Sequence, residues 1–249
     1  MLRTLFHTFL ATLLSMLAAP LAMAQDPAQP EAPAAGESIS DIIFSGGIVG
    51  FLIVALLLLL SMGGLALAVE HLITIRRSVL MPDELVSQLR ELLAQGQVGQ
   101  AVQRCDATPC ALASMMRAAL IEAEAGWPAV EKGLEEETAD QAGRLFRKIE
   151  YLSVLGNIAP MVGLLGTVIG MIMAFREVAD TQGAARAGEL ASGIYQALVT
   201  TVGGLLIAIP SLAAYAVFRN RVDGLIAECM STAKGLLAPV KRALLNRKS

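Results

Sequence analysis

Long apolar runs separated by polar stretches dominate the pattern of this chain. A helix needs about 20 apolar residues to cross a bilayer, and three runs meet that length: residues 42–69, 151–175 and 191–218. Backbone polar groups in lipid must find partners within their own segment, so each run is expected to be a helix. The predicted fold class is an all-α membrane protein with three transmembrane helices.

A further apolar run opens the chain. Residues 1–24 combine Arg3, an apolar core and the sequence Ala-Met-Ala at 22–24, which is typical of a cleaved signal peptide. The alternative is an uncleaved first span, because the run borders on spanning length although Pro20 interrupts it. Residues 25–41 are rich in Pro and Ala and are predicted to form a flexible linker outside the cytoplasm.

Helical patterns fill the segment between the first and second spans. "DELVSQLRELLAQG" follows Pro82 and stops at Gly96, and "ALASMMRAALIEAEAG" stops at Gly126. A third predicted helix begins at Pro128 and meets no helix breaker before the second span. Its apolar positions keep helical spacing at Leu134, Leu145, Ile149 and Leu152. We therefore expect residues 70–150 to form a helical domain whose last helix continues rigidly into the membrane.

The distribution of positive charge predicts the orientation. The short 176–190 connection holds only Arg176 and Arg186. Basic residues gather instead at the opposite ends of the spans: Arg76, Arg77, Arg144, Arg147, Lys148, Arg219 and Arg221. Because loops rich in Lys and Arg stay in the cytoplasm, residues 70–150 and a 219–249 tail are predicted to be cytoplasmic. The N-terminus and the 176–190 loop are predicted to lie outside.

Composition narrows the possible functions. The chain is 55% hydrophobic and 16% charged with a mean hydropathy of +0.61, as expected for a membrane protein. A net charge of −3 and one Trp leave no basic, aromatic surface for nucleic acid. Phosphate loops and metal-ligand clusters are absent from the sequence, so we expect no enzyme activity, no cofactor and no metal. Cys105 and Cys110 lie on the predicted cytoplasmic side, where packing is favoured over a redox or metal role.

Small and weakly polar residues share faces of the second and third runs. The face of the second run carries Gly156, Gly163, Thr167, Gly170 and Ala174. The third run has Ser192, Gln196, Thr200 and Gly203 in one stripe, with Gly193, Ala197, Thr201, Gly204 and Ala208 beside it. Small residues allow close helix approach and polar ones hydrogen-bond between helices, whereas polar residues at membrane depth also line ion paths. Periodicity alone leaves both interpretations open.

The same two runs carry a family resemblance. "IAPMVGLLGTVIGMIMAF" and "ELASGIYQALVTTVGGLLIAIPSLAAYAVF" closely resemble the signature spans of the MotA/TolQ/ExbB proton channel family, in its ExbB-like branch. The resemblance implies a homopentamer in the bacterial inner membrane around a dimer of a single-span ExbD- or TolR-like partner. Proton entry would drive outer-membrane transport through a TonB-like protein, or envelope work. The alternatives are a non-conducting scaffold of the same fold and an unrelated membrane anchor.

The resemblance also implies roles for individual residues. Thr167 and Thr201 match pore-facing threonines, whereas Gln196 stands where ExbB and TolQ proteins typically carry a glutamate. The expected ion-path lining is Thr167, Gln196, Thr200 and Thr201. The expected packing glycines are Gly156, Gly163, Gly170, Gly193 and Gly204. The small faces should line a pore at the fivefold axis while Phe51 to Leu60 face lipid.

A proton carrier is missing from the three runs. None of them contains Asp or Glu, and the amide of Gln196 neither gains nor loses a proton near neutral pH. The chain therefore cannot relay a proton alone, and we expect the carrier to be an aspartate in the span of the ExbD-like partner.

Overall fold

The computed structural model describes residues 47–182 and 187–246. The predicted signal peptide and linker, and the first residues of the first predicted span, lie outside the described residues. Those described form helices and connections without a strand, which confirms the all-α fold. The longer helices are α3 (Gly47–Thr74), α5 (Asp83–Ala94), α6 (Val98–Ala107), α7 (Ala111–Ile121), α8 (Trp127–Asp180), α9 (Ala187–Leu236) and α10 (Ala238–Asn246). Short turns of helix, α4 (Arg77–Leu80) and the 3₁₀ segment η1 (Glu122–Ala125), connect them.

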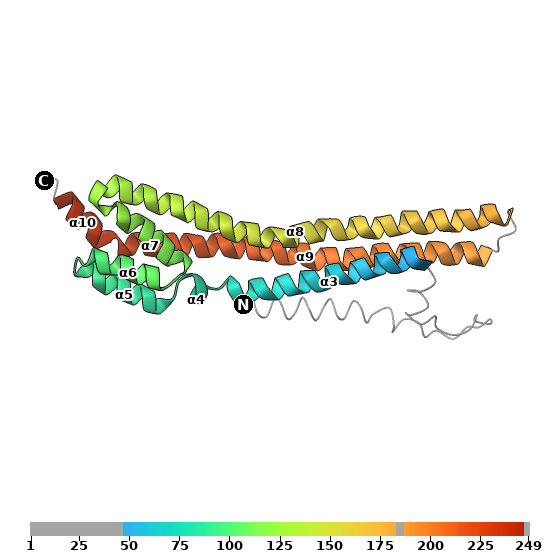
Figure 1. Ribbon diagram of the computed structural model, residues 1–249, viewed down its shortest axis with the longest axis horizontal. Helices are drawn as coiled ribbons and strands as arrows, with labels where there is room; N and C mark the ends of the chain where they lie inside the picture. Colours follow the sequence, from blue (N-terminus) through green and yellow to red (C-terminus); the bar gives the residue numbers. More distant parts are fainter. Residues whose placement is uncertain (1–46, 183–186, 247–249) are drawn as a thin grey trace, which may run out of the picture. The chain divides into compact units, whose positions relative to one another are not determined.

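Three of the described helices, α3, α8 and α9, have the length and apolar character needed to cross a membrane. Helix α3 contacts both α8 and α9, and α8 and α9 contact each other along most of their length (Figure 1). The predicted count of three spans is therefore confirmed for the described part of the chain.

Helix α8 joins the helical domain to the membrane without a break. It starts after Gly126, whose φ of 102° suits glycine, and has a proline in its first turn. The helix then runs through the whole second apolar run to Asp180. This confirms the expectation of one continuous helix that starts near Pro128.

Helix α9 is longer than the third apolar run. The 219–249 segment was interpreted as a tail, but α9 continues to Leu236 and packs against the helical domain. The buried side chains of this extension recur every three or four residues: Phe218, Val222, Ile226, Cys229 and Ala233. The spacing is that of one face of a helix, so the signal was present in the sequence. Both long helices therefore link the membrane to the domain.

Large apolar side chains fill the core of the helical domain. Helices α5 and α7 and the domain ends of α8 and α9 contribute to it. The fully buried members include Leu89, Leu112, Met115, Met116, Leu134, Ile149 and Leu152. Helix α10 closes the end of the domain, where the Nζ of Lys241 lies 4.7 Å from the ring centroid of Trp127.

The expectation that Phe51 to Leu60 all face lipid is wrong for two positions. Ile53 and Leu57 are buried, and a Cβ placed on Gly203 of α9 would lie 3.6 Å from Leu57 Cδ1. A helix that packs on neighbours along one side must turn some residues inward every three to four positions. The apolar run is uniform in composition, so its sequence did not reveal which side that was.

Candidate functional site

The contact between α8 and α9 inside the membrane, here called the seam, brings the two backbones close together. A Cβ added to Gly204 would lie 2.6 Å from the carbonyl oxygen of Ala159, and one added to Gly163 would lie 2.8 Å from that of Thr200. No side chain fits at such distances unless the helices move apart. Small residues are therefore a steric requirement of this contact.

All five glycines predicted to pack helices lie along the seam. Each faces the partner helix: Gly156 faces Leu212, Gly163 faces Thr200 and Thr201, Gly170 faces Ala197, Gly193 faces Ala174, and Gly204 faces Ala159. Gly166 is a sixth glycine of this kind, not among those predicted, and its added Cβ would lie 2.3 Å from Thr200 Oγ1. Gly166 belongs to the same Gly-rich segment, and its spacing of three from Gly163 could have identified it.

Two of the predicted path residues hydrogen-bond across the seam. Thr201 Oγ1 donates to the carbonyl oxygen of Gly163 at 3.1 Å. Thr200 Oγ1 lies 3.2 Å from the same oxygen and 2.7 Å from the carbonyl oxygen of Ala197. A hydroxyl has one hydrogen but two lone pairs. Both threonines, which are half-buried in the single chain, therefore keep the capacity to accept a further hydrogen bond.

Of the other two predicted path residues, the structure describes the side chain of Thr167 alone. Thr167 is buried and donates its hydroxyl to the carbonyl oxygen of Leu164 in its own helix, at 2.7 Å. Gln196 belongs to α9, but its side chain lies outside the described residues. The structure thus brings Thr200 and Thr201 together at Gly163 and gives Thr167 a local partner.

A polar network crosses from α9 to α8 where the spans meet the helical domain. Arg219 Nη1 donates to Tyr215 Oη at 3.2 Å, and Tyr215 Oη donates to Glu150 Oε2 at 3.3 Å. None of these three residues was among the predicted site residues. The sequence shows Glu150 directly before the second apolar run. Its partner Tyr215 could not be identified without the register between α8 and α9.

His71 is a buried imidazole near the same end of α3. Only 2% of its surface is exposed, and its ring meets the Phe218 ring edge-on with 5.7 Å between centroids. Within the described residues, its Nε2 has no hydrogen-bond partner. A buried polar atom without a partner costs free energy. The contact with the Phe218 ring shows that α3 packs on α9 at this position.

The cysteines pack within the helical domain. Cys105 is buried, and its burial raises the pKa of the thiol to about 11. The Sγ of Cys110 accepts a hydrogen bond from the Ala113 amide at 3.4 Å, at the start of α7. Among the described residues, no three His, Cys, Asp or Glu side chains gather as a metal site would require.

Comparison with known proteins decides the family. A sequence model of the MotA/TolQ/ExbB proton channel family matches residues 106–231, which contain all of α8 and most of α9. The chain belongs to the MotA/TolQ/ExbB proton channel family. The putative biopolymer transport protein ExbB-like 1 of Synechocystis is 31% identical to it over 218 residues, covering 86% of this chain and 80% of that protein.

Other relatives match shorter stretches of the chain. The biopolymer transport protein exbB1 of Vibrio cholerae is 40% identical over 88 residues, or 33% of this chain and 39% of that protein. The Tol-Pal system protein TolQ of Pseudomonas aeruginosa is 34% identical over 106 residues, or 43% of this chain and 46% of that protein. These two matches thus span less than half the length of either relative. Family membership and three apolar helices make this chain a multi-pass membrane protein of a channel family.

Proposed function

We propose that this chain is the ExbB- or TolQ-like subunit of a proton-driven motor in the bacterial inner membrane. It forms a homopentamer around a dimer of a single-span ExbD- or TolR-like partner and couples the proton motive force to outer-membrane transport or envelope work. The observation that carries the proposal is the hydroxyl-bearing, glycine-packed seam in a chain whose apolar runs contain no carboxylate. The names of its relatives, a biopolymer transport protein and a Tol-Pal system protein, support the same process.

In this proposal Thr167, Gln196, Thr200 and Thr201 line the ion path, and the partner brings the group that carries the proton. Thr200 and Thr201 use their hydrogens for carbonyl oxygens of the chain itself, so they offer lone pairs to water or to a protonated partner carboxyl. A hydroxyl that only accepts can orient water without becoming charged. The cytoplasmic end of the path is the end with the helical domain, following the charge bias of the loops.

A non-conducting scaffold of the same fold is the second candidate. It is favoured by Gln196, which cannot be ionised, and by the bonds of Thr200 and Thr201 to Gly163, which would also serve as interhelical hydrogen bonds. A scaffold would keep its assembly with the partner but would conduct nothing.

Proton flux separates the two candidates. The chain is reconstituted in vesicles alone, with an ExbD-like single-span protein, and with a variant of that protein in which the aspartate of its span is asparagine. The motor subunit predicts five copies per particle by native mass measurement, and flux only with the unaltered partner. Five-copy assembly with the partner but without flux supports the scaffold. Flux through the chain alone, or a different copy number, contradicts the motor proposal.

A further inference from the structure

Glu150 is a carboxylate at the border between the second apolar run and the helical domain. Its side chain is exposed, and Tyr215 of α9 holds it through a hydrogen bond of 3.3 Å. Arg219, one turn further along α9, donates to the same phenol oxygen at 3.2 Å. Because that oxygen accepts from the guanidinium, the phenol hydrogen is left to point at the carboxylate. The network thus links one carboxylate of α8 to α9 at the domain end of the spans.

The carboxylate of the network lies on the side of α8 that α3 does not cover. A Cβ on Gly64 of α3 would lie 3.9 Å from Leu155 Cδ1 and 3.4 Å from Ser211 Oγ, so these two side chains mark the side toward α3. Glu150 precedes Leu155 by five residues, which places it about 140° around α8 from that side. Its carboxylate therefore projects away from α3.

The same side carries a predicted path residue on α9. Arg219 follows Thr201 by eighteen residues, or about five full helical turns, so the two share a face of α9. A path that passes Thr201 and continues toward the domain therefore reaches the network of Arg219, Tyr215 and Glu150. Other cationic groups on the adjoining part of α8 are Arg147 and Lys148.

We infer that Glu150 is the ionisable side chain through which protons pass at the domain end of the ion path, held in place by Tyr215 and Arg219. The inference rests on the proposed function and adds a residue of this chain to it. The step is a reversible proton transfer: an O–H bond forms at a carboxylate oxygen as one breaks in a water, and the reverse returns the proton to the next water. Tyr215 and Arg219 are positioning residues that hold the carboxylate over the path.

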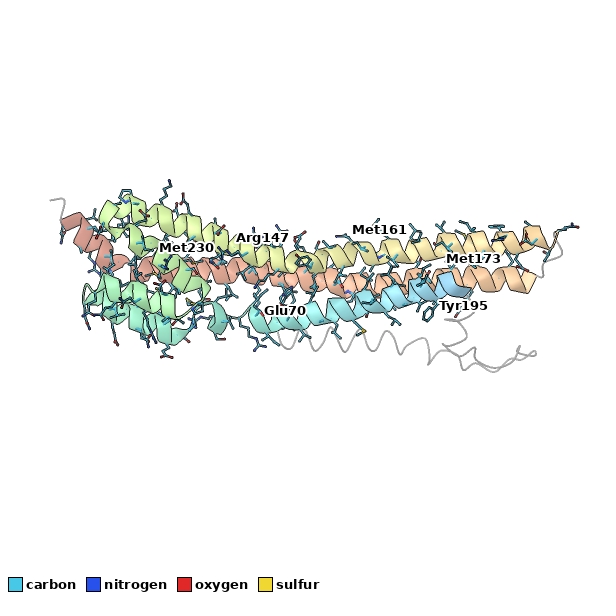
Figure 2. All side chains as sticks on the ribbon, in the orientation of Figure 1. Glu70, Arg147, Met161, Met173, Tyr195 and Met230 are labelled. Atoms are coloured by element: carbon cyan, nitrogen blue, oxygen red, sulfur yellow. The ribbon has the colours of Figure 1, made fainter. Side chains whose placement is uncertain are left out.

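Glu70 provides a matched control. It is an exposed carboxylate on α3 at the same end of the spans, and Figure 2 shows it at a similar level along the helices to Arg147. Its carboxylate interacts electrostatically with His71 of the same helix, and this helix covers the opposite side. Loss of Glu70 removes the same charge at the same depth without touching the network.

The test measures proton flux in vesicles that hold the chain and its partner, with the oligomer yield of every variant. We expect Glu150→Gln to lower flux about a hundredfold, the lower end of the contribution of a positioned proton-transfer group, and Glu70→Gln to change it less than about twofold. Glu150→Asp, which keeps the carboxylate, should restore much of the flux. Tyr215→Phe should lower it partly in the unaltered chain and not at all in the Glu150→Gln background, because its effect runs through Glu150.

The outcomes separate this inference from the proposed function. Absence of flux in the unaltered chain with its partner contradicts the proposed function itself. Flux in the unaltered chain together with normal flux in Glu150→Gln overturns only the role of Glu150. Equal losses in the Glu150→Gln and Glu70→Gln variants show a general effect of surface charge and also overturn it. If Glu150→Gln does not assemble, the Glu150→Asp and Tyr215→Phe variants decide, and normal flux in both overturns the inference.

Discussion

The helical domain and the seam are built from opposite kinds of side chain. In the domain, large side chains such as Leu112, Met115 and Met116 are fully buried, and burial of apolar area from water stabilises the fold. In the seam, glycine and alanine bring the backbones of α8 and α9 together, because lipid offers no such driving force and close packing and hydrogen bonds must supply it. The same two helices use one kind of packing at one end and the other kind in the membrane.

The domain should be sensitive to loss of volume. Leu112 is 0% exposed, so Leu112→Ala leaves a cavity and should lower the free energy of unfolding by about 2–5 kcal/mol. The measurement is chemical denaturation of the full chain in detergent, followed by the fluorescence of Trp127, the one Trp of the sequence. Ile121→Ala, at a side chain that is 51% exposed, is the control and should cost far less. Equal effects of both variants would show that this core is not tightly packed.

The seam should be sensitive to added volume. Gly163→Ala places a methyl group 2.8 Å from the Thr200 carbonyl oxygen and 2.9 Å from the Thr201 Cα, and overpacking of this kind costs about 1–3 kcal/mol. Thermal loss of helicity in detergent measures it. Gly63→Ala on α3 meets nothing within 4 Å and should be neutral or slightly stabilising, since alanine favours helix. A seam that tolerates Gly163→Ala as well as Gly63→Ala would contradict the close approach.

A smaller effect should appear in the pH dependence of the domain. Burial raises the pKa of Cys105 from 9.0 to about 11, so the folded chain keeps this proton at pH values where the unfolded chain has lost it. The stability tied to the thiol is complete below pH 9 and is lost as the pH rises toward 11. Denaturation across this interval should therefore show a steeper fall for the unaltered chain than for Cys105→Ala. Parallel slopes would mean that water reaches the thiol in the folded domain.

The type and position of the helices could be predicted from the sequence better than the contacts between them. The uniform apolar runs were sufficient to predict the spans. The helix stops at Gly96 and Gly126, where φ is positive, were sufficient to predict where α8 starts. The domain extension of α9 was missed although Phe218, Val222 and Ile226 repeat with helical spacing, because a charged segment after a span was interpreted as a tail. Element type follows from local patterns, so most of the fold could be predicted.

The candidate site was harder to predict for a different reason. Small and polar faces on two helices show that the helices can meet, but the register decides which atoms do. The shared acceptor of Thr200 and Thr201 at Gly163, and the link from Tyr215 to Glu150, join residues 37, 38 and 65 positions apart. Sequence spacing within one helix carries no information on such pairs, so they became visible only when α8 and α9 were placed together.

The most direct test of the proposed ion path is the Thr167→Val, Thr201→Val double variant, measured for oligomer yield and proton flux together in the presence of the partner. Valine keeps the shape of threonine and removes the hydroxyl, and loss of the Thr201 bond to Gly163 should cost no more than about 1–2 kcal/mol. The account predicts a normal yield of assembled particles with a strong loss of flux. Normal flux through well-assembled particles would contradict the ion-path role and leave these hydroxyls as packing groups.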